Sequence, residues 1–269
     1  MSELLLVLVF LVIGFTAGVL IGMLGIGGGV LFVPTLYYFL PYIGIKESVV
    51  PYLAVSISLF AGTIASSFSS ILHFRLNNID NKKALFFSLG SCTAAFIAAI
   101  YVTSVDPKIL QGIFAGVLFV IAGNMFINSH LVIKPGNKKS LNEMMLLFIG
   151  LFVGTMSAFT GLGGGIVFFP VLYYLYSMKP KKAIGTSSAI TAVTMFSASL
   201  SFFLNRGEWL YDYELDKIVL LVAIPLGISA LVGARMGVSL TIKLHSVLIK
   251  KIFSILLIIV VIKIIFGLW

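Results

Sequence analysis

The chain has 269 residues, of which 60% are hydrophobic and 10% are charged. A soluble domain carries about 25% charged residues, so this chain has too few to cover a surface that faces water. The formal net charge of +9 does not indicate a nucleic-acid partner, because the basic residues lie in short loops between apolar runs, where they set membrane topology and meet anionic headgroups. We therefore expect an all-α polytopic membrane protein that lies in the lipid bilayer.

Ten apolar segments follow one another along the chain, many of them close to the roughly 20 residues that span hydrocarbon. The first half holds segments at 3–23, 30–42, 51–74, 84–105 and 109–127. The second half holds segments at 141–160, 166–177, 183–204, 218–237 and 247–269. The N-terminus lacks the basic region of a cleavable signal peptide, so the first segment is predicted to be a retained helix.

The second half repeats the first at a shift of 136 residues, which places Gly161 on Gly25 and Pro170 on Pro34. The density of identities around these positions indicates a tandem duplication. The predicted organisation is a first transmembrane repeat, an inter-repeat loop and a second transmembrane repeat, over residues 1–127, 128–140 and 141–269.

A cluster of four glycines in five residues follows the first segment of each half, at Gly25, Gly27, Gly28 and Gly29 and at Gly161, Gly163, Gly164 and Gly165. Each glycine costs about 1 kcal/mol relative to alanine in a helix, so the clusters predict glycine-broken helices. In a bilayer such backbone must be buried in protein or line a watery cavity. The next helix then starts with unpaired N–H groups, which attract anions. The alternative is close helix packing alone, as small residues at every fourth position favour.

The distribution of basic residues predicts how the segments cross the membrane. If all ten cross, 13 of the 18 Lys and Arg residues fall on one face, and Lys46, Lys108, Arg206, Lys217 and Lys263 fall on the other. This positive-inside bias disappears if segments 30–42 and 166–177 are re-entrant, an alternative that the sequence leaves open. Ten crossings place both termini outside and give two inverted-topology repeats of about five helical segments each. Secondary transporters recurrently use this plan.

Polar side chains at Ser56, Ser58, Thr186, Ser187 and Ser188 begin the third segment of each half, where Val55-Ser56-Ile57-Ser58 matches Gly185-Thr186-Ser187-Ser188. We predict that they and the glycine clusters bind substrate, offering neutral donors to an oxyanion; the alternative is hydrogen bonding between helices. His73 and Arg75 lie at the other end of the segment at 51–74 and are the possible coupling residues. His73 is a possible coupling group because imidazole exchanges protons near neutral pH, although a headgroup-level position is the ordinary alternative.

Several kinds of chemistry lack a sequence signal. The single Cys92 permits neither a disulfide framework nor a cysteine metal site. The sequence contains no phosphate-binding loop for ATP and no H-E-x-x-H motif. We therefore predict no enzyme activity, no cofactor and no metal.

The duplicated Gly-x-Gly-Gly-Gly…Pro elements at 25–34 and 161–170, followed by Gly185-Thr186-Ser187, resemble the TauE/SafE family of sulfite and organosulfonate permeases. The resemblance covers essentially the whole chain. Asn77 and Val55-Ser56 depart from the family pattern, which has glycine and Thr-Ser there. The resemblance implies movement of small anions such as sulfite or sulfoacetate, often outward and driven by the proton gradient.

The resulting hypothesis is a secondary transporter that moves a small anion across the plasma (inner) membrane by alternating access, with export coupled to the proton gradient. Two alternatives remain: an uncoupled anion channel, and a membrane subunit that assists a partner without transporting. The sequence also leaves open a homo-oligomer, the solute and the direction of transport.

Overall fold

A computed structural model describes residues 3–106, 109, 112, 116, 119, 142–205 and 218–243. Within these ranges the chain forms helices and no strand. Six helices are long and apolar enough to span a membrane, and two shorter apolar helices accompany them, at Gly29–Phe39 and Gly165–Leu175. The prediction of an all-α polytopic membrane protein is confirmed.

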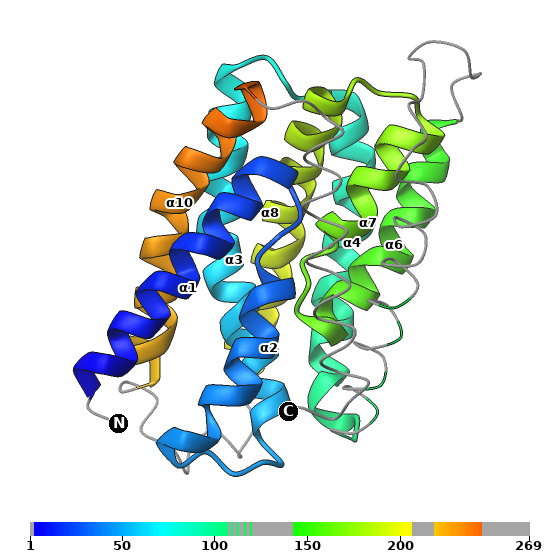
Figure 1. Ribbon diagram of the computed structural model, residues 1–269. Helices are drawn as coiled ribbons and strands as arrows, with labels where there is room; N and C mark the ends of the chain where they lie inside the picture. Colours follow the sequence, from blue (N-terminus) through cyan, green and yellow to red (C-terminus); the bar gives the residue numbers. More distant parts are fainter. Residues whose placement is uncertain are drawn as a thin grey trace.

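The main helices, with the labels of Figure 1, are α1 (Glu3–Leu24), α2 (Gly29–Phe39), α3 (Val50–Arg75), α4 (Asn81–Tyr101), α6 (Glu143–Thr160), α7 (Gly165–Pro170), α8 (Pro180–Leu204) and α10 (Ile224–Lys243). Short helical turns extend four of them. The 3₁₀ turns η1 (Pro41–Ile43) and η2 (Val102–Ser104) follow α2 and α4. The π-helical turn η3 (Val171–Leu175) continues α7, and the π-helical turn η5 (Val219–Ala223) directly precedes α10. Eight predicted segments are confirmed as helical. The other two, 109–127 and 247–269, and the predicted loop 128–140 lie mostly or wholly outside the described residues.

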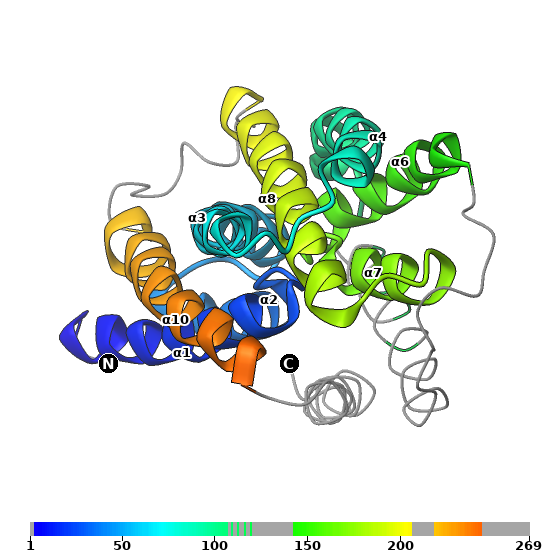
Figure 2. The same ribbon diagram turned by 90° about the horizontal axis from the view of Figure 1, so that it is seen from above.

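The helices pack in a pattern that is the same for both halves of the chain (Figure 2). Helices α3 and α8 lie together at the centre, with α10 against α3 and α4 against α8. Helix α1 of the first half packs along α10, and α6 of the second half packs along α4. One apolar core lies between α1, α2, α3 and α10, and another lies between α4, α6, α7 and α8. Each half therefore completes its core with a helix from the other half.

Glycines allow α1 and α6 to approach their partner helices closely. A Cβ atom at Gly18 would collide with the Ala230 backbone on α10, and one at Gly154 would collide with the Ser91 backbone on α4. Small residues at every fourth position commonly produce such contacts between membrane helices. Close packing is therefore the role of the glycines within α1 and α6, whereas the glycine clusters that follow have a different conformation.

Helices α1 and α6 run in opposite directions along the bundle (Figure 1). Helix α1 ends near the end of α3, and α2 then returns to the start of α1, where the Phe39 and Phe10 rings are 5.7 Å apart. In the second half the chain likewise returns to the start of α6, because the Tyr176 hydroxyl donates to the Asn142 carbonyl at 3.1 Å. Each glycine cluster with its short helix therefore carries the chain back along the helix before it.

Candidate functional site

The glycine clusters break the helices, as predicted. Helix α1 ends at Leu24 and α6 ends at Thr160, and a buried, non-helical stretch follows each. Left-handed φ angles between +67° and +77°, which favour glycine, occur at five positions in these stretches: Gly25, Gly27, Gly161, Gly163 and Gly164. We call the two stretches together, residues 25–29 and 161–165, the glycine crossing.

The two stretches lie side by side in antiparallel directions at the centre of the molecule. A Cβ atom at Gly29 would collide with the Gly161 carbonyl oxygen, and one at Gly165 would collide with the Gly25 carbonyl oxygen. The start of each stretch therefore contacts the end of the other, backbone against backbone. Only glycine permits this approach, so the crossing explains why each half needs its cluster.

A serine from the central helix of each half holds the crossing stretch of the other half. The Ser58 hydroxyl on α3 donates to the Gly161 carbonyl at 2.8 Å, and the Ser187 hydroxyl on α8 donates to the Gly25 carbonyl at 2.8 Å. Ser187 also lies 3.3 Å from the Gly165 carbonyl. Ser58 thus corresponds to Ser187, whereas the sequence comparison paired it with Ser188. The register of that comparison was wrong by one residue.

The Met195 side chain of α8 fills the middle of the crossing. Its sulfur lies 2.5 Å from the point where a Cβ atom of Gly163 would stand and 3.4 Å from the corresponding point at Gly27. Its terminal methyl group occupies the space that Gly62 of α3 leaves empty. Met195 is fully buried, and the Ser66 hydroxyl is 3.9 Å from its sulfur. A flexible side chain therefore occupies the middle of the crossing.

The other predicted hydroxyls make different contacts. Ser56 donates to the Leu53 carbonyl of its own helix, at 3.0 Å. Ser188 lies beside Gly25 and is 3.2 Å from the Ser69 hydroxyl. Farther along α8, the side chains of Thr194, Ser197 and Ser201 contact or donate to α4. On that part of α8 the hydroxyls form hydrogen bonds between helices.

Thr186 links the loop between α3 and α4 to the start of α8 by hydrogen bonds. Its hydroxyl accepts from the Asp80 amide at 2.9 Å and donates to the Lys182 carbonyl at 2.7 Å. Asp80 caps α4 and pairs with Lys83 at 2.9 Å. Partial burial alone would raise the pKa of the Asp80 carboxyl, but the bonds from Lys83 and the charges of Lys83 and Lys182 outweigh it and hold that pKa below its ordinary value.

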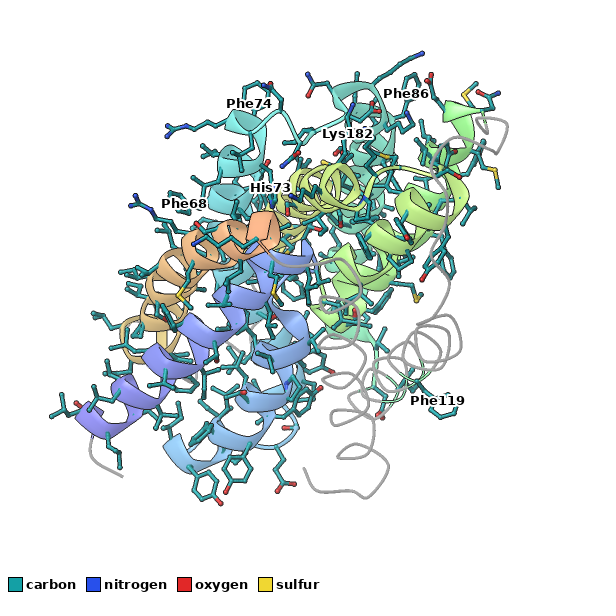
Figure 3. All side chains as sticks on the ribbon, turned by 45° about the horizontal axis from the view of Figure 1, so that its top comes forward. Phe68, His73, Phe74, Phe86, Phe119 and Lys182 are labelled. Atoms are coloured by element: carbon teal, nitrogen blue, oxygen red, sulfur yellow. The ribbon has the colours of Figure 1, made fainter. Side chains whose placement is uncertain are left out.

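His73, near the end of α3, lies inside the bundle and beside the end of α1, whereas its neighbour Phe74 is exposed (Figure 3). The His73 side chain is fully buried, and its Nε2 atom is 3.3 Å from the Gly22 carbonyl oxygen. The Thr241 hydroxyl of α10 lies 3.3 Å from the same oxygen. The Nδ1 atom of His73 has no hydrogen-bond partner among the described residues. A buried titratable group thus lies beside the entry to the first glycine stretch.

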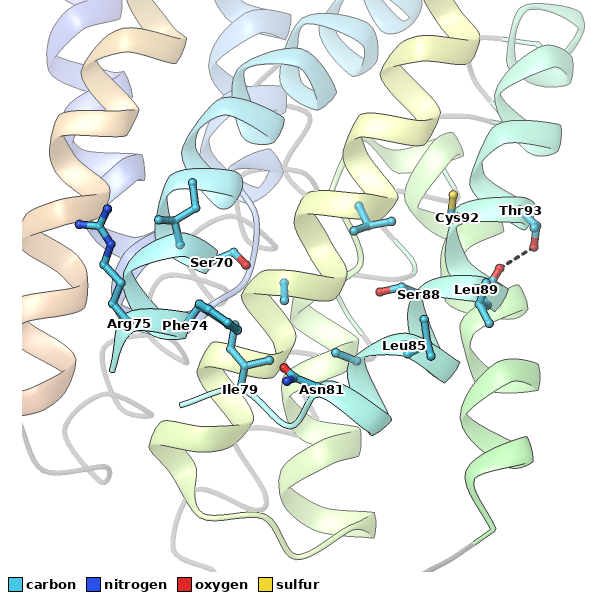
Figure 4. A pocket seen from close by; sticks show the side chains of 14 residues that line it. Ser70, Phe74, Arg75, Ile79, Asn81, Leu85, Ser88, Leu89, Cys92 and Thr93 are labelled. Atoms are coloured by element: carbon cyan, nitrogen blue, oxygen red, sulfur yellow. Dashed lines mark hydrogen bonds between the residues drawn. The ribbon is translucent and has the colours of Figure 1, made fainter. Parts of the chain in front are cut away.

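An open groove of about 750 Å³ lies between α3 and α4, with α8 behind it (Figure 4). Its lining is mainly apolar, and Arg75 and Asn81 lie at its polar end. Phe74 and Leu85 in its walls are 61% and 58% exposed. The groove is thus a lateral surface feature that does not reach the glycine crossing, and Arg75 belongs to it rather than to the His73 environment.

Three residues at the centre of the crossing were absent from the sequence prediction: Met195, Gly62 and Ser66. Their signal lies in the correct alignment of α3 with α8, in which Gly62 corresponds to Thr191 and Ser66 to Met195. In the ranges that the structure covers, no group of three or more His, Cys, Asp or Glu residues is placed to hold a metal ion.

The sequence pattern of the family described as "Sulfite exporter TauE/SafE" matches residues 10–264 of the chain. A probable membrane transporter protein of Haemophilus influenzae is 29% identical over 96% of this chain and 97% of its own length. The probable membrane transporter proteins MJ0441 of Methanocaldococcus jannaschii and YunE of Bacillus subtilis are 28% and 24% identical, each over 94% of both chains. The comparison with solved structures gives no significant match.

Proposed function

The chain belongs to the sulfite exporter TauE/SafE family of membrane transporters, and we propose that it is a secondary transporter that moves a small anion by alternating access. The proposed solute is sulfite, sulfoacetate or a related sulfur compound. The proposed direction is export across the plasma (inner) membrane, driven by the proton gradient. The observation that carries the proposal is the glycine crossing, where broken helices from both halves meet within the bundle.

The arrangement of the halves supports this mechanism. Helices α1 and α6 run in opposite directions, and the halves exchange equivalent helix contacts and meet at the crossing, which is the plan expected of inverted-topology repeats. Rocking one half against the other would open the crossing to either side in turn. Because the crossing is buried in the described conformation, an opening movement is required, which favours a transporter over a permanently open channel.

The backbone at the crossing supplies donors suited to an anion. The amides of Gly28, Gly29 and Val30 have no acceptor among the described residues. They lie at the start of α2, where the helix dipole also favours negative charge. No Lys, Arg, Asp or Glu is fully buried in the described part of the chain, so neutral donors would hold the solute.

The basic residues support the proposed orientation. Arg75, Lys82, Lys182 and Lys243 lie at the end of the bundle where α3 and α10 end and α4 and α8 begin, whereas Lys46 lies at the opposite end. A cytoplasmic position for the basic end follows from the positive-inside rule. It would place the start of α1, and hence the N-terminus, outside.

The deciding experiment is flux of sulfite, thiosulfate, sulfoacetate and acetate in proteoliposomes, with and without an imposed proton gradient. We expect one sulfur anion to move, with flux that collapses when the proton gradient is removed at a fixed solute gradient. Flux that ignores the proton gradient would instead indicate an uncoupled channel. No flux of any solute would contradict the proposal.

The same assay tests the crossing through Gly164→Leu. Gly164 has a φ of +73°, and its Cβ atom would lie 2.7 Å from the Phe168 ring, so leucine there distorts the crossing locally. We expect the variant to insert in the membrane but to lose transport. Retained flux would contradict the assignment of the site.

A further inference from the structure

The polar groups around Met195 lack the strong hydrogen bonds that the two serines of the crossing make. The hydroxyls of Ser58 and Ser187 are already bonded to glycine carbonyls. Thr191 of α8 is fully buried, and its Oγ1 atom has no hydrogen-bond partner among the described residues. Burying a hydroxyl without a hydrogen-bond partner is unfavourable, so an unpaired one indicates a missing partner.

Thr191 lies at the crossing beside Met195, one turn away along α8. Its methyl carbon is 3.1 Å from the point where a Cβ atom of Gly27 would stand, and the Met195 sulfur is 3.4 Å from that point. Ser66 reaches the Met195 sulfur from the opposite helix at 3.9 Å, a weak contact for a hydroxyl donor. Ser66 and Thr191 therefore lie close to the same thioether from different halves, and neither hydroxyl has a strong partner among the described residues.

A backbone donor lies at the other end of the same side chain. The point where a Cβ atom of Gly62 would stand is occupied by the Met195 methyl group and is 3.7 Å from the Gly28 nitrogen. Removing the Met195 side chain from this space would leave three residues near it that carry donors: the hydroxyl residues Ser66 and Thr191, and Gly28 with its amide. No fully buried cation or carboxylate is described anywhere in the bundle.

We propose that the transported anion binds in the space that Met195 fills here, with Ser66 and Thr191 as its side-chain donors, and that Met195 is the plug that the solute displaces. The proposal rests on the proposed transport function and names its binding residues. Methionine suits a plug because its unbranched, flexible side chain changes rotamer readily. The space is that of one side chain, so the ligand class is a compact oxyanion rather than a bulky organosulfonate.

The asymmetry of α3 and α8 supports this assignment. At the equivalent positions α3 has Gly62 and Ser66, whereas α8 has Thr191 and Met195. The glycine on one helix thus makes the room that the methionine of the other helix fills. Met195 belongs to an apolar cluster that includes Leu59 and Ala198, but its sulfur and methyl group also face glycines and the Ser66 hydroxyl, which a filler of an apolar core would not need.

The first test measures sulfite and thiosulfate binding to purified protein by thermal shift. Thr191→Val preserves side-chain shape and removes the hydroxyl, so it should weaken binding at least about tenfold. Ser197→Ala is the matched control, since that hydroxyl bonds to the Cys92 carbonyl away from the crossing and its loss should leave affinity unchanged. Equal affinity of Thr191→Val and the unmodified protein would overturn the assignment.

The second test needs no solute, so it separates this proposal from the transport function. In a Cys92→Ser background, Ser66→Cys places a thiol beside the plug, and a small anionic methanethiosulfonate reagent measures its accessibility. Adding Met195→Ala should accelerate modification at least about tenfold, whereas Met195→Leu, which keeps the volume, should not. Unchanged reactivity in Met195→Ala would overturn the plug even if the protein transports. Accelerated modification with no flux of any anion would instead contradict only the transport proposal.

Discussion

The two stretches of the glycine crossing are held alike, but the helices that hold them differ. Ser58 and Ser187 donate to the carbonyl at the start of the opposite stretch at the same distance, 2.8 Å. Near the middle of the crossing the equivalence ends, since Gly62 of α3 corresponds to Thr191 of α8. The serine–carbonyl bonds that both halves share hold the two backbone stretches together. The residues that differ between α3 and α8 determine what fills the space between them.

A similar difference appears at the ends of the central helices. His73 of α3 contacts the end of α1, whereas the equivalent position of α8 is Phe202. The two halves thus share the backbone contacts of the crossing, whereas only the first half has a buried imidazole among the described residues. Variants at equivalent positions should therefore behave alike where the two halves share contacts and differently elsewhere.

The largest effect is expected from Gly29→Ala and Gly165→Ala, which add a methyl group where the two backbones touch. Backbone cannot move aside as a flexible side chain can, so each variant should lose about 1–3 kcal/mol of unfolding free energy together with transport. Thermal unfolding in detergent measures the first quantity and proteoliposome flux the second.

Gly44→Ala is the control for that pair. Gly44 has a φ of +88° with nothing near its Cβ position, so alanine there adds backbone strain of about 1–2 kcal/mol without a collision. Transport should survive in this variant. If Gly29→Ala or Gly165→Ala transports as well as Gly44→Ala does, the stretches do not need to touch.

The next effect concerns the two serines that hold the crossing. Ser58→Ala and Ser187→Ala each leave a buried glycine carbonyl without its side-chain donor, which should cost about 1 kcal/mol of unfolding free energy. Ser56→Ala is the matched control, because that hydroxyl bonds only within its own helix. A clear loss at one serine and none at the other would show that the crossing is not held symmetrically.

Much of this architecture could be predicted from the sequence. Apolar runs located eight segments, and consecutive glycines located the breaks, because both signals are local. The antiparallel contact of the stretches was not predictable, since it depends on which carbonyl each serine reaches. Ser58 and Ser187 were predicted as solute donors because sequence shows donors but not their acceptors. Met195 was missed because its role depends on a space that Gly62 leaves on another helix.

A smaller effect on stability but a specific effect on transport is expected from His73→Gln. Glutamine can still donate to the Gly22 carbonyl, and Thr241 also reaches it, so stability should change by no more than about 1 kcal/mol. If His73 couples transport to protons, flux in this variant should no longer respond to an imposed proton gradient. Arg75→Gln, on the groove, should keep that response. An unaltered response in His73→Gln would exclude the imidazole as the coupling group.

The smallest effect is expected where the connection after α3 meets α8. The folded state holds the pKa of Asp80 below its ordinary value of about 3.9, so the charged carboxylate stabilises the protein above that pH and the contribution disappears as pH falls through the lowered pKa. Asp80→Asn keeps a capping side chain but loses the pair with Lys83, so it should be about 0.5 kcal/mol less stable at pH 7. Unfolding temperatures measured from pH 7 down to pH 3 should show the gap between variant and unmodified protein closing. A gap that does not narrow toward pH 3 would mean that Asp80 acts through its shape and its cap, not through its charge.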